Sequence, residues 1–157
     1  MVLTTSLEGE SKDTGTFLGS IAREIQQYGR PISPPCVILS AGETTTKITD
    51  SSLVKGHGGP SQEMTLSFAM AAAETRGACL ISIDTEGTDG TTTAAGGITD
   101  SRSLQHAHNL DLDVFKALRE HAAYEALQQM GDTVVTGNTG TNLCDLNIMY
   151  IPEIEAR

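Results

Sequence analysis

Two loops of the sequence combine acidic side chains with glycine, threonine and asparagine. The first, SIDTEGTDGTTTAAGG (residues 82–97), ends the apolar run CLISI and carries Asp84, Glu86 and Asp89. The second, VVTGNTGTNLCDL (residues 134–146), repeats the layout of apolar run, Gly/Thr/Asn loop and acid. Glycine lets backbone N–H groups approach an anion, threonine adds hydroxyl donors, and carboxylates could meet the Mg²⁺ of a nucleotide. One such loop would be interpreted as a turn, but two loops, with KGHGG before a buried helix, favour a ligand site.

The four histidines do not form a recognisable metal-binding motif. His106 and His108 are two residues apart in QHAH, and side chains at this spacing point to different sides of a helix. Shared ligation by this pair would therefore need a non-helical backbone. A metal site built on histidine is not favoured.

Several other catalytic motifs are absent. Neither loop contains the GK[ST] of a Walker-type nucleotide loop, and no serine lies in a G-x-S-x-G elbow. Cys36, Cys79 and Cys144 form no CxxC pair, so neither a zinc site nor a redox motif is indicated. Cys36 and Cys79 lie in strand-like apolar runs, which is typical of small buried residues.

The composition is that of one globular domain, which we assign to residues 1–157. The chain is 38% hydrophobic and 19% charged, and it has no tryptophan. No apolar run is long enough to span a membrane, and the start MVLTTSLEGESKD lacks the pattern of a secretory signal. We therefore expect a cytoplasmic protein without a membrane partner.

The acidic balance argues against binding to nucleic acid. The formal net charge is −10, from 20 acidic residues against 10 lysines and arginines, and there is no basic run. Affinity for nucleic acid depends mainly on basic side chains that neutralise phosphates. A small anion is still an acceptable ligand, because backbone N–H groups at loops and helix N-termini can hold it.

The hydrophobic periodicity predicts several helices. The first spans residues 14–28, with Asp13 as its N-cap and Gly29 as its C-terminal stop. Its apolar face comprises Phe17, Leu18, Ile21, Ile25 and Tyr28. Further helices are predicted over residues 61–75, from Asp100 or Ser101 to about residue 108, from Asp111 or Asp113 onward, and over residues 122–130.

Short apolar or β-branched runs between these helices predict strands. They are CVILS (36–40), TTTKIT (44–49), ACLISI (78–83), TVVT (133–136) and LNIMYI (146–151), and the last residues, PEIEAR, are expected to fray. The uninterrupted apolar strands indicate burial on both faces. We therefore predict an α/β layered domain, with a mainly parallel or mixed sheet flanked by helices.

Several glycine-rich blocks, in order, resemble the MOFRL domain, the C-terminal domain of class II glycerate kinases, some of which are recorded as hydroxypyruvate reductases. The blocks are LEGE, GRPISPPCVILSAGETT, KGHGGPSQE, GTDGTTTAAGGITD, EALQQMGD and VTGNTGTNLCDL, which together span nearly the whole chain. The N-terminal kinase domain of that family has no counterpart in residues 1–157. The resemblance makes this chain a single MOFRL-like domain.

The resemblance implies a function in phosphoryl transfer. In such kinases an α/β domain of this kind closes over a Rossmann-like N-terminal domain, and ATP with Mg²⁺ phosphorylates the 2-hydroxyl of D-glycerate in the cleft between them. Catalysis of this type consists mostly of positioning and charge neutralisation. The implied partners are that N-terminal domain, in cis or on a separate chain, and a small hydroxy acid. A lone domain would expose its docking face, so we also expect at least a homodimer.

The residues that the resemblance assigns to the cleft lie in four segments. The candidates for binding substrate or nucleotide are Glu43, Thr44, His57, Gly58, Gly59, Gln62, Glu63, Asp89, Gly90, Thr136, Gly137, Thr139, Gly140, Thr141 and Asn142. Asp89 is also the candidate for contact with the nucleotide's Mg²⁺. No catalytic residue can be assigned, because Pro60 stands where the family has an arginine.

Three departures from the family pattern bear on activity. The family reads GGRNQE where this chain has Gly58-Gly59-Pro60-Ser61-Gln62-Glu63, and neither Pro60 nor Ser61 can pair with a carboxylate or phosphate as arginine does. Thr93 replaces an acid, and Asn138 replaces a proline. His57 lies at an often basic position and could compensate in part.

Three functions therefore compete. The first is the C-terminal domain of a glycerate 2-kinase, inactive without its N-terminal domain. The second is a degenerate MOFRL module that binds a small anion or a partner protein without chemistry. The third is an independent metal-dependent hydrolase that uses Asp84, Asp89 and a histidine.

Overall fold

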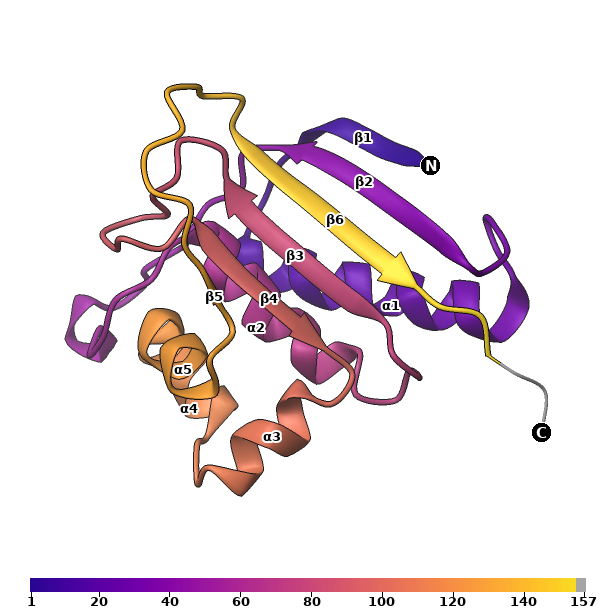
Figure 1. Ribbon diagram of the computed structural model, residues 1–157. Helices are drawn as coiled ribbons and strands as arrows, with labels where there is room; N and C mark the ends of the chain where they lie inside the picture. Colours follow the sequence, from indigo (N-terminus) through magenta and orange to yellow (C-terminus); the bar gives the residue numbers. More distant parts are fainter. Residues whose placement is uncertain (155–157) are drawn as a thin grey trace.

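The structure is a computed structural model that describes residues 1–154. Within these residues the chain forms one six-stranded sheet, five α-helices and a 3-10 helix, Ser51–Leu53 (Figure 1). The strands are β1 (Val2–Leu7), β2 (Cys36–Gly42), β3 (Cys79–Asp84), β4 (Gly96–Asp100), β5 (Thr133–Val134) and β6 (Asp145–Ile151). The helices are α1 (Ser11–Tyr28), α2 (Pro60–Ala71), α3 (Ser103–Asn109), α4 (Val114–Arg119) and α5 (Ala123–Met130). The expected fraying of the last residues concerns in part residues 155–157, which lie outside this range.

The sheet is mixed, with the strand order β1-β2-β6-β3-β4-β5. Among the described strands only β1 and β2 pair in parallel, and all other neighbouring strands are antiparallel. The α/β class and the mixed sheet are confirmed, whereas a mainly parallel sheet is not what the chain forms. β6 is the last strand of the sequence but lies in the middle of the sheet, between β2 and β3.

The main core lies between one face of the sheet and helices α1 and α2. Ile38, Leu80 and Met149 point inward from three adjacent strands and are almost fully buried. They pack against Leu18 of α1 and Phe68 of α2, which are also buried. Burying each such side chain contributes about 1.5–3 kcal/mol, which makes this layer the main source of stability.

Two glycines allow α1 to lie directly against α2. A Cβ atom at Gly15 would collide with the backbone oxygen of Met64, and one at Gly19 would collide with the Cβ of Ala71. The two helices can therefore approach more closely than larger side chains would permit. This contact fixes the position of the N-terminus of α2, which lies at the candidate site.

Helices α3, α4 and α5 form a second cluster beside α2. Leu66 of α2 is buried against Val114, Leu118 and Leu127. The N-cap of α4 is Asp113, whose carboxylate accepts a hydrogen bond of 2.9 Å from the backbone N–H of Lys116, so that cap is confirmed. None of the helices in the described chain has the length and apolar character needed to cross a membrane.

Most predicted helices are present, but their starts differ. α1 begins at Ser11 with Glu10 at the N-cap, so the assignment of Asp13 as N-cap was wrong, while Gly29 does end the helix in the left-handed region. Phe17 and Tyr28 are exposed, and the buried face of α1 is instead formed by smaller residues together with Leu18 and Ile25. α3 starts after Arg102 rather than at Asp100 or Ser101, α2 ends at Ala71 rather than Thr75, and α5 ends at Gly131 as expected.

The strand predictions were less complete. Residues 44–49 do not form a strand, since only Thr45 makes an isolated bridge, to Glu10. β1 and β4 were not predicted. β4 contains Gly96 and Gly97, which have low strand propensity, but a Cβ at Gly96 would collide with the backbone oxygen of Ser82. Tertiary packing therefore selects glycine in this strand against its local preference.

Helices cover one face of the sheet in the described chain, and the other face carries large apolar side chains. Val37 and Tyr150 are 40% and 44% exposed on this second face, and they pair across β2 and β6. Figure 1 shows the strands in front of α1 and α2, with no described helix in front of them. The expected burial on both faces is thus only half realised within these residues.

Candidate functional site

The candidate site lies at one end of the sheet, at the upper left of Figure 1. β2 and β3 both run antiparallel to β6, so they end where β6 begins. The connections after β2, β3 and β5 all leave from this end, and α2 starts there. Ligands of α/β sheets gather beyond the carboxyl ends of strands, which is the position of the two Thr/Gly loops.

The two loops contact each other directly. The hydroxyl of Thr139 donates to the backbone oxygen of Thr85, and the N–H of Thr139 donates to the backbone oxygen of Glu86 at 3.2 Å. The side-chain amide of Asn142 donates to Glu86 Oε1 at 2.8 Å. Segments more than 50 residues apart thus form one surface, and Thr139 and Asn142 serve to join them.

A cavity of about 250 Å³ lies beneath the loops. Its lining comprises Glu43, Thr44, Pro60, Asp84, Glu86, Asp89, Gly90, Asn142, Cys144 and Asp145. Five of these ten residues carry carboxylates, and none is lysine or arginine. Five predicted residues, Glu43, Thr44, Asp89, Gly90 and Asn142, are therefore brought together around a single space.

Asp145 is a cavity residue that the sequence reasoning did not name. Its carboxylate accepts hydrogen bonds from the backbone N–H of Thr44 at 3.3 Å and from the hydroxyl of Ser61 at 3.3 Å. Burial raises the pKa of Asp145, and the charges of Asp84 and Glu43 raise it further. The sequence pattern could have identified it, because Asp145 is the acid at the end of the second loop, and Asp84 is the acid at the start of the first.

Asp89 supplies the N-terminal cap that α2 lacks in its own sequence. The N-cap residue is Gly59, which has no side chain, and Asp89 accepts from the backbone N–H groups of Ser61 at 3.2 Å and Gln62 at 2.9 Å. The side-chain amide of Gln62 donates to the same carboxylate at 2.9 Å. Burial raises the pKa of Asp89 to about 7, although these hydrogen bonds act to lower it.

The glycines around Asp89 are explained by close packing. A Cβ at Gly59 would overlap the Asp89 carboxylate, and one at Gly90, whose φ is +61°, would overlap the backbone oxygen of Gly58. Pro60 is the first residue of α2, a position that proline favours because no N–H partner is needed there. The N–H groups that a helix start could offer to an anion are therefore directed at Asp89.

A second hollow of about 370 Å³ adjoins the cavity. It is lined by Glu86, Thr88, Asn138, Gly140, Thr141 and Asn142, and it shares Glu86 and Asn142 with the first. Gly140, with φ of +74°, donates its N–H to Asn138 Oδ1 at 2.8 Å. Gly140 and Thr141 are thus predicted residues that lie at the site but outside the carboxylate cavity.

Other predicted residues serve different contacts. His57 faces Glu125, with its ring Nδ1 2.7 Å and its backbone N–H 2.9 Å from the carboxylate. Gly58 packs near Ala123 of α5. Thr136 and Gly137 are exposed and meet the first loop at Gly87 rather than the cavity.

Glu63 and Gln62 lie behind the cavity wall. Glu63 is 1% exposed, and its carboxylate lies 2.7 Å from the ring Nδ1 of His121 and 3.9 Å from Nζ of Lys12. Burial raises the pKa of Glu63, while His121 and Lys12 act to lower it. His121 adopts a left-handed φ of +51°, which is uncommon for a residue other than glycine. This buried pair joins the α4–α5 connection to α2 and has no access to a ligand in the cavity.

The carboxylates do not form a complete metal cage. Within residues 1–154, no group of three or more His, Cys, Asp or Glu side chains is placed to hold a metal ion. Mg²⁺ in phosphoryl-transfer sites takes one or two carboxylates and completes its shell with water and phosphate oxygens. The cavity acids fit that partial role, whereas the independent metal-dependent hydrolase has no metal centre in the described chain.

Comparison with known proteins identifies close relatives. Glycerate 2-kinase from Pyrococcus horikoshii is 43% identical over 156 residues, covering 99% of this chain and 34% of that protein. D-glycerate 2-kinase from Thermotoga maritima is 37% identical, covering 96% and 35%. The crystal structure of glycerate kinase from Thermotoga maritima superposes with a TM-score of 0.91 over 96% of this chain and 36% of that one.

The chain therefore spans about a third of the length of these relatives. Its fold is that of the matching third in the solved kinase structure. A sequence model of the MOFRL family matches residues 36–145, which include both loops and every carboxylate of the cavity. The chain belongs to the MOFRL family.

Proposed function

We propose that this chain forms one wall of an interdomain active site in a glycerate 2-kinase-type phosphotransferase, which phosphorylates D-glycerate with ATP. The carboxylate-lined cavity at the sheet end carries this proposal. It is supported by the two relatives described above, which are named as glycerate 2-kinases and match 99% and 96% of this chain. The remaining kinase domain, in cis or on another chain, would supply the opposite wall. ATP-dependent chemistry would place the protein in the cytoplasm.

The electrostatics of the cavity explain why this wall needs a counterpart. Glu43, Asp84, Glu86 and Asp145 face a space that contains no basic side chain among its lining residues. Glycerate and ATP are both anions, so this cavity alone repels them. A bound Mg²⁺ would neutralise charge on the phosphate oxygens between them and the carboxylates. The positive groups that contact the substrate must then come from the other domain.

The residues of this chain contribute positioning. Asp84 and Asp145 are direct partners in the β3–β6 register, so their carboxylates are fixed side by side by the sheet. The hydrogen bond from Asn142 to Glu86 holds the two loops at one separation. Thr44 and Ser61 orient Asp145 through its two oxygens. A rigid wall of this kind can present acids to a metal–nucleotide complex without rearrangement.

A degenerate, non-catalytic MOFRL module is the second candidate. The observation that favours it is Pro60, which replaces the family's arginine and begins α2 without strain. Asp89 moreover occupies the N–H groups at the start of this helix. In that case the chain would bind a small anion or a partner protein through the loops alone.

A chimeric kinase tests the proposal. This chain would replace the matched third of the Pyrococcus horikoshii enzyme, and ADP formation from ATP would be followed with D-glycerate. We expect activity in the chimera and negligible activity from the isolated chain. Asp84→Asn and Asp145→Asn should each lower kcat by about 100-fold or more, as expected for lost charge positioning. Glu74→Gln, on an exposed turn after α2, is the matched control and should have no effect.

Each outcome separates the two candidates. A folded chimera without activity, restored by neither magnesium nor Pro60→Arg, would support the non-catalytic module. A strong gain of activity in Pro60→Arg would count against that module. Phosphorylation of glycerate by the isolated chain at the rate of the chimera would show that no second domain is required.

A further inference from the structure

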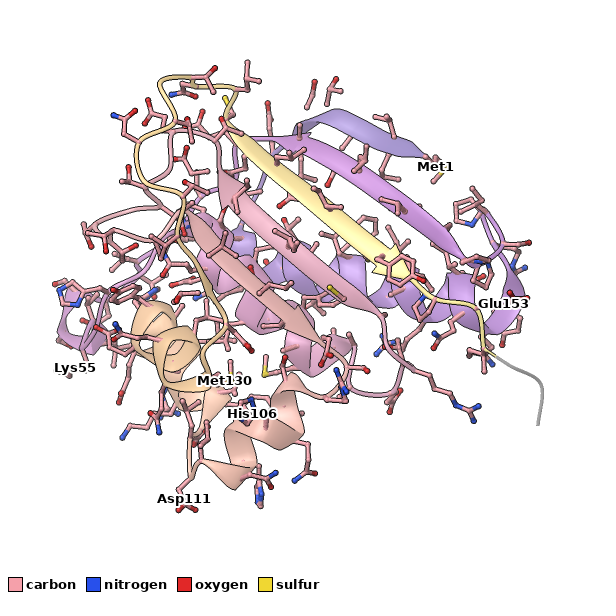
Figure 2. All side chains as sticks on the ribbon, viewed as in Figure 1. Met1, Lys55, His106, Asp111, Met130 and Glu153 are labelled. Carbon is pink, nitrogen blue, oxygen red and sulfur yellow. The ribbon has the colours of Figure 1, made fainter. Side chains whose placement is uncertain are left out.

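The uncovered face of the sheet is apolar across four strands. We call it the open face, and it comprises Val37, Leu39, Ala41, Cys79, Ile81, Ile83, Ile98, Leu146, Ile148 and Tyr150. The strand register arranges them in rows: Leu39, Ile148, Ile81 and Ile98 are successive partners across β2, β6, β3 and β4. None of these ten residues is charged, and Asp100, the register partner of Cys79 in β4, places one carboxylate at their edge. Figure 2 shows side chains projecting from this side of the sheet, opposite α1 and α2.

Such a face is not typical of an antiparallel sheet in contact with water. Antiparallel sheets that are wet on one side alternate apolar and polar residues along each strand. In β6 the inward residues include Asn147 and Asp145, while the outward ones are Leu146, Ile148 and Tyr150. The outward side is thus at least as apolar as the inward side. Contiguous apolar surface of this kind marks a contact with another protein surface.

The open face extends between the carboxylate cavity at one end and a separate hollow at the other. At one end the open face reaches the carboxylate cavity, because Ile83 precedes Asp84 and Leu146 follows Asp145. At the other end lies a hollow of about 410 Å³, lined by Cys79, Ile98, Thr99, Asp100, Arg102, Ser103, His106 and Asp132. A layer packed along the rows would therefore extend from this hollow to the rim of the site.

A second copy of this chain is disfavoured as the occupant. Each copy carries a formal net charge of −10, so two copies repel each other as their faces approach. The relatives, in contrast, contain about twice as much additional polypeptide as this chain supplies. An apolar second face is unusual for a mainly antiparallel sheet in contact with water, so the additional polypeptide is the layer available to cover it.

We propose that the open face is the docking surface for an apolar layer, supplied by the part of a glycerate 2-kinase that this chain does not match. The inference rests on the proposed function, because it assigns the same missing polypeptide a second contact besides the cavity. The docked layer holds the opposite wall of the cleft beside the acids, so affinity comes from the open face and chemistry from the cavity.

The alkylation rate of the native cysteine Cys79 tests this proposal. Cys79 lies half-buried on the open face, and its rate of alkylation would be compared, by peptide mass, between the isolated chain and the chimeric kinase described above. We expect alkylation of Cys79 to be at least about tenfold slower in the chimera, as for a residue in a stable interface. Equal rates in the two proteins would overturn the proposal.

Substitutions on the most exposed residues of the face make the test specific. Val37→Lys with Tyr150→Lys should leave the melting temperature of the isolated chain nearly unchanged, because both residues are already 40% or more exposed. In the chimera the pair should remove the protection of Cys79. Phe115→Lys, at a 67% exposed residue of α4, is the control and should change neither protein. Protection that survives the double substitution would refute the assignment.

The experiment also separates this proposal from the proposed function. A chimera that protects Cys79 but lacks kinase activity would keep the docking surface and reject the function. An active chimera with unprotected Cys79 would do the reverse. Protection that disappears when a dimeric chimera is diluted to monomers would assign the open face to a second copy and overturn the inference.

Discussion

Replacing Asp89 by alanine tests whether its carboxylate caps helix α2 or is available to bind a metal ion. The change removes the acceptor for the backbone N–H groups of Ser61 and Gln62 and for the Gln62 amide. Loss of an N-cap costs about 0.5–2 kcal/mol. The Gln62 amide keeps its hydrogen bonds to Thr92 and to the backbone oxygen of Asp89, so its lost bond costs about 0.5–1.5 kcal/mol more. Asp89→Ala should therefore destabilise the domain by about 1–3 kcal/mol, even without any ligand.

The sign of the effect is informative because Asp89 lies in an acidic cavity. Burial raises the pKa of Asp89 and the charge of Asp145 raises it further, so removing the carboxylate also removes the cost of burying its charge. If that cost dominated, Asp89→Ala would stabilise the protein in the absence of metal. Near pH 4 the native carboxyl group is protonated and this cost is small, so the structure predicts a loss of stability there, since three donors point at the carboxyl group.

Urea unfolding followed by circular dichroism measures this difference. Asp113→Ala is the matched control, because Asp113 caps the short helix α4 through one backbone N–H and lies on an exposed surface. It should cost no more than about 1 kcal/mol. An Asp89→Ala variant that loses no more stability than Asp113→Ala, or that gains stability, would refute the cap.

Three further predictions follow from the buried polar groups and the helix contact. The native pKa of Asp89 is about 7 and its unfolded pKa is near 3.8, so between these pH values the native state binds one more proton than the unfolded state. The free energy of unfolding should therefore fall by at most about 1.4 kcal/mol per pH unit as the pH rises through this window. The urea midpoints of Asp89→Asn should not show this dependence on pH. Glu63→Ala should lower the free energy of unfolding by about 3–5 kcal/mol, because it leaves His121 without its buried partner. A thermal melt measures this loss, and a loss below about 1 kcal/mol would contradict the pairing. Gly15→Val should cost about 1–3 kcal/mol or more in the same melt by forcing α1 away from α2, whereas Ser20→Ala should be nearly neutral.

Much of the fold could be predicted from local sequence, because the strongest elements follow periodicity and punctuation. The strands around Ile38, Leu80 and Met149 are apolar runs between clear breaks, and Gly29 and Gly131 end helices as their conformational freedom predicts. β4 could not be predicted in the same way. Its glycines are selected by the approach of β3, which is a contact between segments that local propensity does not describe.

The candidate site shows the same division. The two Thr/Gly loops were predicted to belong together, and the hydrogen bonds of Thr139 and Asn142 join them. The separate roles of the residues could not be predicted, since a buried acid that caps a helix has the same sequence signature as one that meets a ligand. Asp89 and Glu63 are distinguished from Asp84 only by which donors surround them, and this depends on packing that the sequence pattern does not show.

The central position of β6 sets the order in which the domain can assemble. In the sheet that residues 1–154 form, β2 and β3 are joined only through this last strand, which supplies the partners of both over residues 145–151. During synthesis the two halves of the sheet therefore remain unpaired with each other, as separate hairpin and helix units, until β6 has left the ribosome. Pairings so distant in sequence are slow to form, and they leave apolar strand edges exposed meanwhile. A ribosome stalled before residue 145 would thus hold a chain dependent on chaperones, whereas emergence of β6 would allow the whole sheet to close in one step.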